Sequence, residues 1–437
     1  MSFITNIRSV AKYESKILVR SWFFRIFTLL AVVILGFFNF AMMLMEDSGD
    51  FWFGKAVSSN IPYLNLLLLN TGQAVVAVFL SSEFLKRDKK LDTSEVFYVR
   101  PLSNAEYVVG KIWGNLRVFL LLNLLILTIV LVFNFMASGI TVDWQAYPVY
   151  FFLISIPTLI FIIGLSIFLM LVLRNQALTF ILLLGYIGLT LFYIQDKFYY
   201  LFDYMVYNLP LFKSTIVGFS SLELILNHRA IYFFAGLGFI FFAIFLFKRL
   251  PNAKRSHYPW LFLSFCMFLL AGTAGFRHVR SILREGEMRA LYTSINNKYV
   301  HEPKMAIDYY DISVEQKPET IRSVVGMKGT ALATSGVFTF CLNPGLRVEE
   351  VKEGEKPLDF KREEQILTVD FGREIAEGDT VSLSVCYEGR IKDDFCYLDI
   401  PAEVLQQPYD KEMLKLDKKY SFQTPDYELF TTETYWY

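Results

Sequence analysis

Residues that could support hydrolysis are few and poorly spaced. A zinc peptidase site uses two histidines four residues apart on one helix face, with a glutamate beside the first. The nearest match is His301-Glu302-Pro303-Lys304-Met305, in which Met305 takes the place of the second histidine and Pro303 would break the helix. We therefore interpret His301 as a surface loop residue and predict no metal site in this chain.

Nucleotide chemistry has no better support. Gly54-Lys55 and Gly110-Lys111 both lack the upstream glycine and the following Ser or Thr of a phosphate loop. The 42 basic and 42 acidic residues balance, so nothing draws the chain to nucleic acid. We predict a chain that is not an enzyme, with no cofactor of its own.

The four cysteines also lack the spacing of a zinc site. Cys266 lies in an apolar run, and Cys341, Cys386 and Cys396 lie in the C-terminal part. Cys386 and Cys396 are the nearest pair and would suit a disulfide in an oxidising compartment. Burial as small side chains explains them equally well.

Composition predicts the surroundings of these residues. The 437 residues are 54% hydrophobic and 19% charged, whereas soluble domains carry about 25% charged residues. A spanning helix needs about 20 mostly apolar residues. Seven runs meet this length and predict a membrane domain over 26–276, with the lipid bilayer as its first partner; they lie near 26–45, 60–82, 116–137, 148–173, 177–195, 230–247 and 258–276.

Charge predicts the orientation of these spans. Residues 1–25 carry Lys12, Lys16 and Arg20 among apolar side chains and suit a basic amphipathic helix on the cytoplasmic leaflet. The 83–115 and 248–257 loops are basic too, which places the N-terminus in the cytoplasm and the C-terminal domain outside the cell membrane.

The segment 196–229 leaves the orientation open. Asp203, Asn208 and Pro210 make it a poor span, so we expect interfacial helices on the outer face. If it crossed the membrane, the C-terminal domain would be cytoplasmic. The basic segment after the last span, with Arg277 and Arg280, also runs against the positive-inside tendency.

Polar and small residues within the spans favour packing over substrate binding. We interpret Asn65, Asn70, Asn123, Asn134, Ser155, Ser166 and Thr179 as residues that pair helices. Pro157 is expected to kink the fourth span, and Gly164, Gly185 and Gly188 to allow close helix approach.

A strand pattern begins near residue 306, after a linker over 277–305. Val381, Leu383 and Val385 alternate with small polar residues, and turn residues such as Gly378-Asp379 separate the runs. The pattern predicts an all-β sandwich within 306–437, with an irregular extension after residue 400. The fold class is thus a polytopic α-helical membrane domain followed by a β-sandwich.

The loop between the second and third spans carries a further pattern. Thr93-Ser94-Glu95-Val96 is followed by Pro101-Leu102-Ser103, where Pro101 ends one element and Ser103 can cap the next, and then by Gly110-Lys111. This loop resembles the signature region of ABC exporter permeases of the type-2 class. Asp92 stands where that family usually has a glycine.

This resemblance implies a function. Residues 86–107 would form a coupling helix that docks in a cytoplasmic ATP-binding subunit, with the basic N-terminal helix beside it. ATP would be bound by that partner, and permeases would pair as a homodimer or heterodimer in the bacterial inner membrane. An ordinary solvated loop is the alternative. The implied coupling residues are Arg87, Thr93, Glu95, Arg100, Pro101, Ser103, Gly110 and Lys111.

The C-terminal part has a resemblance of its own. Its runs Ile307–Ile312, Leu342–Leu346, Ile375–Asp379 and Tyr387–Gly389 are similar to the N-terminal β-sandwich of gluzincin-type zinc aminopeptidases. Bacterial permeases fused to such peptidases form a family that this chain resembles, with the catalytic domain missing, as in a truncated or split form. A second hypothesis follows: a membrane anchor presents a non-catalytic sandwich to a separately encoded aminopeptidase.

Overall fold

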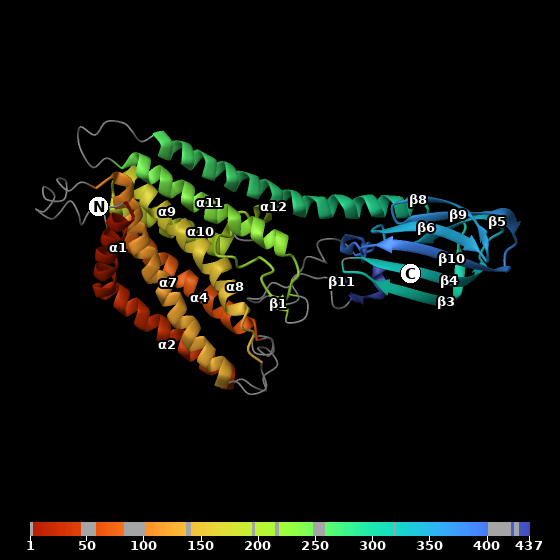
Figure 1. Cartoon of the computed structure of the whole chain (residues 1–437), viewed down its shortest axis with the longest axis horizontal. Helices are drawn as coiled ribbons and strands as arrows, with labels where there is room; N and C mark the ends of the chain where they lie inside the picture. Colours follow the sequence, from red (N-terminus) through yellow and green to blue (C-terminus); the bar gives the residue numbers. More distant parts are fainter. Residues whose placement is uncertain are drawn as a thin grey trace, which may run out of the picture. The chain divides into compact units, whose positions relative to one another are not determined.

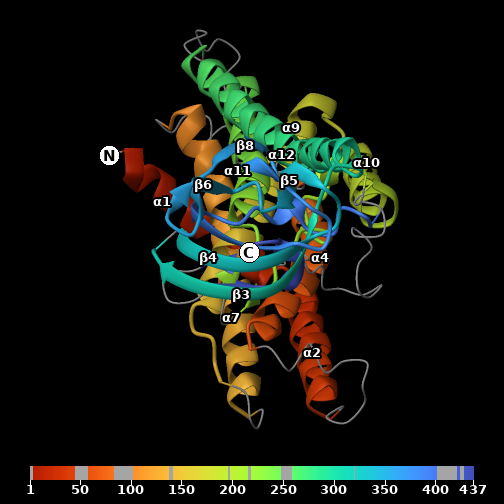
Figure 2. The same ribbon diagram turned by 90° about the vertical axis from the view of Figure 1, so that its right-hand side faces the viewer.

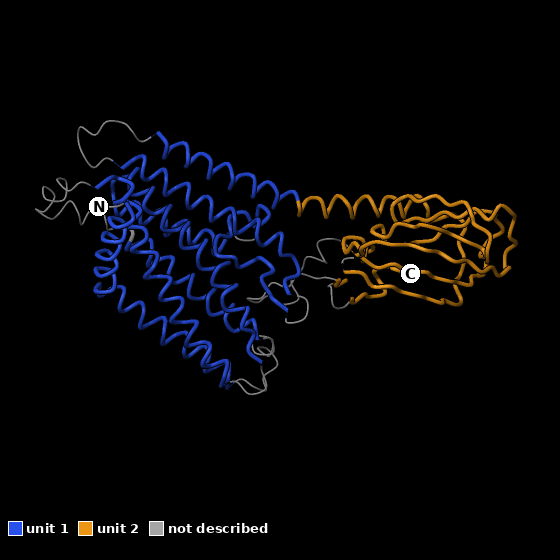
Figure 3. The backbone as a smooth tube through the Cα atoms, in the orientation of Figure 1, with its two compact units in different colours: residues 1–280, 410–416 blue, residues 281–409, 417–437 orange. Residues whose placement is uncertain are grey.

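The computed structural model describes residues 3–44, 58–82, 102–136, 141–194, 197–214, 218–247, 258–318, 320–400, 421–423 and 428–437. The chain divides into two compact units, chiefly residues 1–280 and chiefly residues 281–409 with 417–437 (Figure 3). The first unit is helical and the second is built of β-strands (Figure 1). This is the predicted fold class.

Within the described ranges, seven helices are long and apolar enough to cross a membrane. A shorter helix, α1 (Phe3–Arg20), precedes them, and Ser21 separates it from the first. The seven are α2 (Trp22–Leu44), α4 (Asn60–Ser82), α7 (Asn104–Met136), α8 with α9 (Ala146–Tyr150 and Ile156–Leu173), α10 (Gln176–Leu189, prolonged by a π-helical turn to Ile194), α11 (Leu222–Leu246) and α12 (Tyr258–Lys298).

Each predicted apolar run is helical, but four boundaries differ. The first, third and sixth helices begin earlier than expected, at Trp22, Asn104 and Leu222, because their first turns contain charged or polar residues that interrupt the apolar runs. The seventh helix continues to Lys298, so most of the predicted linker over 277–305 is helical.

The extra length of α12 is stabilised within the second unit. Tyr292 and Ile295 are buried. Gln365 donates from Nε2 to the backbone oxygen of Tyr292 at 2.7 Å and to Oδ1 of Asn296 at 2.8 Å. Packing of this amphipathic stretch favours helix over an irregular linker.

Helix packing in the first unit confirms one of the three expected glycine contacts. A Cβ on Gly164 of α9 would lie 2.6 Å from the backbone oxygen of Gly236 on α11, so only glycine permits this approach. Gly185 and Gly188 on α10 have no atom of the described structure within 4 Å of such a Cβ. The expectation is wrong for these two.

The segment 197–214 differs from its prediction. It forms a short 3-10 turn (Phe198–Tyr200), bends and a two-residue strand, and it contains no interfacial helix. Asp203, Tyr204 and Val206 are buried in the core that this segment shares with the helices. Irregular backbone can be buried in a membrane protein only where other groups satisfy its polar atoms.

The second unit is a β-sandwich, as predicted. A five-stranded antiparallel sheet has the order β3-β4-β10-β6-β7, and a three-stranded one the order β5-β9-β8. Figure 2 shows β3 and β4 side by side. The strands are β3 (Met305–Gln316), β4 (Ile321–Ala331), β5 (Ser335–Cys341), β6 (Leu346–Glu353), β7 (Lys356–Pro357), β8 (Asp359–Glu363), β9 (Ile366–Ile375) and β10 (Thr380–Gly389).

The sandwich core lies between the two sheets. Val381, Leu383 and Val385 point inward from β10, and Val369 and Phe371 do so from β9. This alternation is the period of two in the sequence, since successive strand residues face opposite sides.

The C-terminal residues also belong to the sandwich. Strands β11 (Ser421–Gln423) and β12 (Glu428–Phe430) pair, and Phe430 and Trp436 pack against the sandwich core. Asn343 donates from Nδ2 to the backbone oxygen of Thr434 at 2.9 Å. The described parts of the extension, 421–423 and 428–437, are therefore held by the sandwich and are less irregular than predicted.

Candidate functional site

The predicted coupling residues divide into two groups. Arg87, Thr93, Glu95, Arg100 and Pro101 lie outside the described residues. The other three, Ser103, Gly110 and Lys111, occupy the start of α7, and the basic residues Lys12, Lys16 and Arg20 lie on α1. The structure brings these two segments into contact.

Helix α7 begins with a reciprocal cap. The backbone N–H of Ser103 donates to Oε2 of Glu106 at 2.6 Å, and the backbone N–H of Glu106 donates to Oγ of Ser103 at 3.1 Å. This capping box satisfies donors that the first helical turn would leave unpaired. The expected capping role of Ser103 is confirmed.

Two glycines let α1 lie directly on α7. A Cβ on Gly110 would be 2.7 Å from Cβ of Val10, and one on Gly114 would be 2.7 Å from Cβ of Glu14. Real Cβ atoms do not approach so closely, so a larger residue at either position would push the helices apart. Gly110, chosen from the sequence as part of a Gly-Lys pair, is thus a packing residue.

Polar contacts fix the register of the two helices. Lys111 Nζ lies 2.9 Å from Oε2 of Glu14, and both side chains are buried. Asn6 donates from Nδ2 to Oε1 of Glu106 at 2.9 Å. We call this contact, between α1 and the N-terminal turns of α7, the α1–α7 junction.

A further set of hydrogen bonds lies one turn along the junction. Ser15 donates from Oγ to the backbone oxygen of Gly114 at 2.7 Å. Arg117 donates to Oγ of Ser15 at 2.5 Å and to the backbone oxygen of Ala11 at 3.0 Å. Charge-assisted bonds of this kind are stronger than neutral ones, so they hold the two helices firmly together.

The opposite face of α1 carries its positive charge. Lys12, Lys16 and Arg20 are exposed, whereas Ala11, Glu14, Ser15 and Leu18 are buried. These positions follow the helical period, so one helix presents a packed face to α7 and a basic face outward. Such a basic face suits an anionic surface.

A second polar cluster lies in the interior of the same unit. Pro157 has no N–H and its ring clashes with the carbonyl four residues earlier, that of Leu153. The backbone responds with a π-helical turn over Phe151–Ser155, a form that is common at functional sites. The freed carbonyls need donors.

Arg229 of α11 supplies those donors. Its guanidinium donates to the backbone oxygens of Leu153 at 2.7 Å and Ile154 at 3.4 Å. It also donates to Oγ1 of Thr158 at 2.9 Å and to the backbone oxygen of Tyr204 at 3.1 Å. One buried cation thereby holds the π-turn and the irregular segment 197–214 together.

Two histidines hold the start of that segment. Phe198, Tyr199 and Tyr200 all have φ between 52° and 62°, the left-handed region that costs a non-glycine residue about 1–2 kcal/mol. His228 bonds from Nε2 to the backbone oxygen of Tyr200 at 3.0 Å, and His278 to that of Tyr199 at 2.8 Å. The surrounding helices thus impose this turn.

Four amide and hydroxyl side chains link α4, α7 and the π-turn. Gln73 donates to Oδ1 of Asn70 at 2.6 Å and accepts from Nδ2 of Asn123 at 2.8 Å. Ser155 donates to Oδ1 of Asn123 at 2.8 Å. All four are fully buried, so the network confirms that Asn70, Asn123 and Ser155 pair helices.

Sequence reasoning missed Arg229 and Gln73. The sixth span was predicted to start at residue 230, which left Arg229 just outside it. The structure starts α11 at Leu222 and so places this cation within the helix. The available signal was a charged residue next to an apolar run, which is a functional-site indicator when it lies within a span.

Metal and disulfide chemistry are both unsupported in the described part of the chain. No group of three or more His, Cys, Asp or Glu residues is placed to hold a metal ion there. His301 is exposed in a turn after α12, as interpreted. All four cysteines are free thiols.

The suggested pairing of Cys386 with Cys396 is therefore not formed. On β10 the inward positions are Val385 and Tyr387, so Cys386 faces outward, and its thiol lies 3.6 Å from Oε2 of Glu349. Cys396 is fully buried, and burial raises the pKa of its thiol to about 12. The alternative of small, buried side chains fits Cys396.

Comparisons with known proteins give little further guidance. No family model matches this chain, and no curated protein matches it. Solved structures that resemble part of it include an M1 zinc metallopeptidase from Deinococcus radiodurans and a mutant of it bound to a Tyr-Ser-Ala substrate. Each is 18% identical with a TM-score of 0.19, over 20% of this chain and 21% of that chain.

Proposed function

We propose that this chain is the membrane-spanning permease subunit of an ABC-type exporter and works with a separate cytoplasmic ATPase. The α1–α7 junction is the observation that carries the proposal. It ties the basic N-terminal helix to the helix that directly follows the loop resembling a coupling region. The described end of the implied coupling region, at the start of α7, thus contacts the basic helix, which is the kind of contact that mechanical coupling requires.

In this proposal, the α1–α7 junction passes movement of the 83–101 loop on to α1. The loop over 83–101 connects α4 to α7, so a force on it acts first on the capped start of α7. The Lys111–Glu14 pair and the glycine contacts then carry α1 along. The chain acts in this proposal as a two-state element that a partner biases.

The buried network supports the next step. Gln73 lies on α4 and Asn123 on α7, and Ser155 is in the π-turn that precedes α9. Their hydrogen bonds join the two helices on either side of the loop to a third. Fully satisfied buried networks rigidify the groups that they join, so we propose that these helices shift as one group.

The remaining parts of the proposal follow from the resemblance. ATP binds to the partner, two permeases pair as a homodimer or a heterodimer, and the complex lies in the bacterial inner membrane. The basic face of α1 rests on the cytoplasmic leaflet, and the β-sandwich is extracytoplasmic.

The test is co-purification of an ATPase with the full chain from its own host. Deletion of 93–103 should abolish co-purifying ATP hydrolysis while the protein still inserts and elutes as a single species. The matched control is replacement of Lys356, an exposed residue of the β-sandwich, by Ala. Retained ATPase co-purification after the deletion would remove the coupling role.

A second candidate function is supported by the second unit. It has its own core, and its edge strand β3 leaves Tyr309 57% and Val314 46% exposed. We propose as the alternative that the helices anchor this sandwich for assembly with a separately encoded aminopeptidase. Peptidase activity that co-purifies with the chain, and survives deletion of the loop, would favour this alternative.

A further inference from the structure

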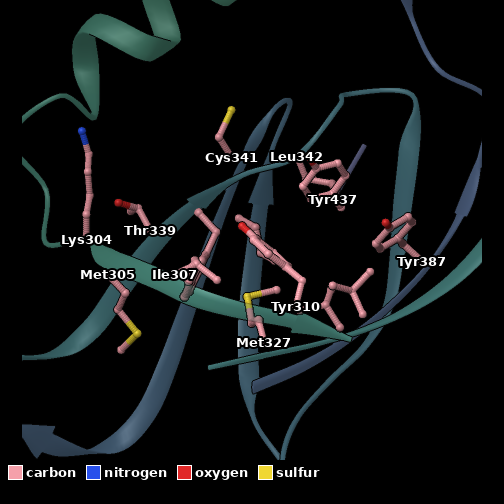
Figure 4. Close-up of a pocket in the computed structure, with 14 residues that line it drawn as sticks. Lys304, Met305, Ile307, Tyr310, Met327, Thr339, Cys341, Leu342, Tyr387 and Tyr437 are labelled. Carbon is pink, nitrogen blue, oxygen red and sulfur yellow. The ribbon is translucent and has the colours of Figure 1, made fainter. Parts of the chain in front are cut away.

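A cavity lies between the two sheets of the β-sandwich (Figure 4). Its volume is about 240 Å³. Tyr310 of β3 and Met327 of β4 line it from the five-stranded sheet, and Cys341 of β5 and Leu367 of β9 from the three-stranded sheet. It forms where the narrower sheet leaves the β3–β4 edge of the wider one incompletely covered.

Two of the polar side chains that line this cavity already form hydrogen bonds within the chain. Thr339 donates from Oγ1 to the backbone oxygen of Pro303 at 3.0 Å, and the hydroxyl of Tyr387 bonds the backbone oxygen of Trp436. The other side chains facing the space are mostly aliphatic, aromatic or thioether groups. An apolar cavity of about 150 Å³ stays dry and takes up benzene, so this one has room for a longer apolar group.

One cation lines the cavity, and a second bonds the backbone of a residue that lines it. Lys304 lines it and is exposed to solvent. Arg362 donates from Nη2 to the backbone oxygens of Leu342 and Asn343, at 2.8 and 2.9 Å, whereas its Nη1 is buried with no hydrogen-bond partner in the described structure. A buried, unpaired guanidinium donor is costly and favours an anionic acceptor.

Cys341 also lines this cavity. Burial raises the pKa of its thiol to about 11, and the charges of Arg362 and Lys304 act against this rise. Cys341 and Leu342 both face the space, and the backbone oxygen of Leu342 accepts from Arg362. This part of the cavity combines low polarity with positive charge.

We propose that this cavity binds an amphiphile, with its apolar chain between the sheets and its anionic head at Lys304, where Arg362 adds positive charge behind Leu342. The adaptable thioethers of Met305 and Met327 suit a flexible aliphatic chain. A free fatty acid and an anionic phospholipid share this chemistry. The proposal is independent of the exporter function, because it involves only the β-sandwich.

Protection of Cys341 from a small thiol reagent tests the proposal. The protein is the full chain in lipid nanodiscs without free detergent, with Cys266, Cys386 and Cys396 replaced by Ser. Octanoate at ten times its dissociation constant should slow labelling of Cys341 about tenfold. A chain that retains only Cys386, which faces outward, is the matched control and should label at an unchanged rate.

The choice of probe separates the head from the tail. Octylamine, with the same chain and the opposite charge, should protect Cys341 far less than octanoate. Dihexanoyl phosphatidylglycerol tests the lipid source, and protection by it but not by octanoate would assign the site to phospholipid. Absence of protection by both anionic probes, or equal protection by octylamine, would overturn the proposal.

Two substitutions complete the test. Val325→Phe fills the cavity and should abolish protection by octanoate, whereas Val369→Phe, in the core but away from the cavity, should not. Lys304 is exposed, so the chain should still fold after Lys304→Gln. This substitution should weaken the protection of Cys341 by octanoate severalfold. Full protection in both Val325→Phe and Lys304→Gln would show that octanoate acts elsewhere.

Discussion

Lys111 Nζ lies 2.9 Å from Oε2 of Glu14, and the two side chains are only 5% and 3% exposed. The ammonium also lies 5.3 Å from the ring centre of Tyr107, one turn earlier on α7. A buried ion pair contributes little net stability over an apolar pair, but it strongly penalises any arrangement that separates the charges. It therefore specifies how α1 sits on α7.

The first prediction concerns this pair. Glu14→Gln and Lys111→Met should each lower the free energy of unfolding by about 3 kcal/mol or more, because each leaves one buried charge without its partner. The double variant Glu14→Leu with Lys111→Met should recover much of that loss. Thermal unfolding of the full chain in nanodiscs measures both effects.

Lys12→Met is the control for the ion pair. Lys12 lies on the exposed face of the same helix, so its replacement should change stability by about 0.5 kcal/mol or less. Equal effects at Lys12 and Lys111 would show that the pair has no special role.

The second prediction concerns helix contact. Gly114→Ala places a Cβ 2.7 Å from Cβ of Glu14 and 2.9 Å from the backbone oxygen of Ala11. It should destabilise the chain by about 1–3 kcal/mol and reduce ATPase co-purification. Gly185→Ala meets no atom within 4 Å and should stabilise α10 by about 0.5–1 kcal/mol. A stabilising Gly114→Ala would contradict the packing of α1 on α7.

The third prediction concerns Arg229. Arg229→Met removes the donors of four hydrogen bonds and should cost about 3 kcal/mol or more, since each buried group left unpaired costs about 1–3 kcal/mol. Arg229→Lys keeps the charge but lacks the fork of donors, so it should retain only part of the stability that Arg229 provides. Yield of folded protein and its melting temperature measure these losses.

Arg277→Met is the matched control for Arg229. Arg277 pairs with Glu223 at 3.1 Å, but the two side chains are 65% and 75% exposed. Arg277→Met should change the free energy of unfolding by no more than about 0.5 kcal/mol. If Arg229→Met changed the free energy of unfolding equally little, the hydrogen bonds of Arg229 to the π-turn would not stabilise the chain.

The fourth prediction concerns orientation. Cys396 is a poor reporter, because its side chain is fully buried, whereas that of Cys341 is only partly so. Lys356→Cys, on an exposed strand end in a chain without other cysteines, should react in intact cells with a reagent that cannot cross membranes. Labelling only after lysis would place the β-sandwich in the cytoplasm.

Sequence reasoning succeeded where a local rule dominates. Seven apolar runs predicted seven helices because burial of backbone polar groups in lipid leaves few alternatives. The capping role of Ser103 followed from side-chain chemistry within four residues. The alternation around Val385 predicted a sandwich strand because neighbouring strand residues face opposite sides.

It failed where distant residues decide. The polarity of 197–214 indicated a surface segment, but Arg229 and two histidines from α11 and α12 satisfy its backbone and allow its burial. The basic stretch after Phe276 indicated a linker, but contacts such as that of Gln365 with Tyr292 keep it helical. None of these partners is adjacent in sequence.

The amino-acid sequence by itself determined the fold class and which segments carry charge, because hydrophobicity and its period act locally. Only the tertiary structure decided that Glu14 meets Lys111, that Arg229 caps a π-turn, and that a cavity remains between sheets of unequal width. Those contacts join residues far apart in the chain, and their energies depend on burial, which no local pattern specifies.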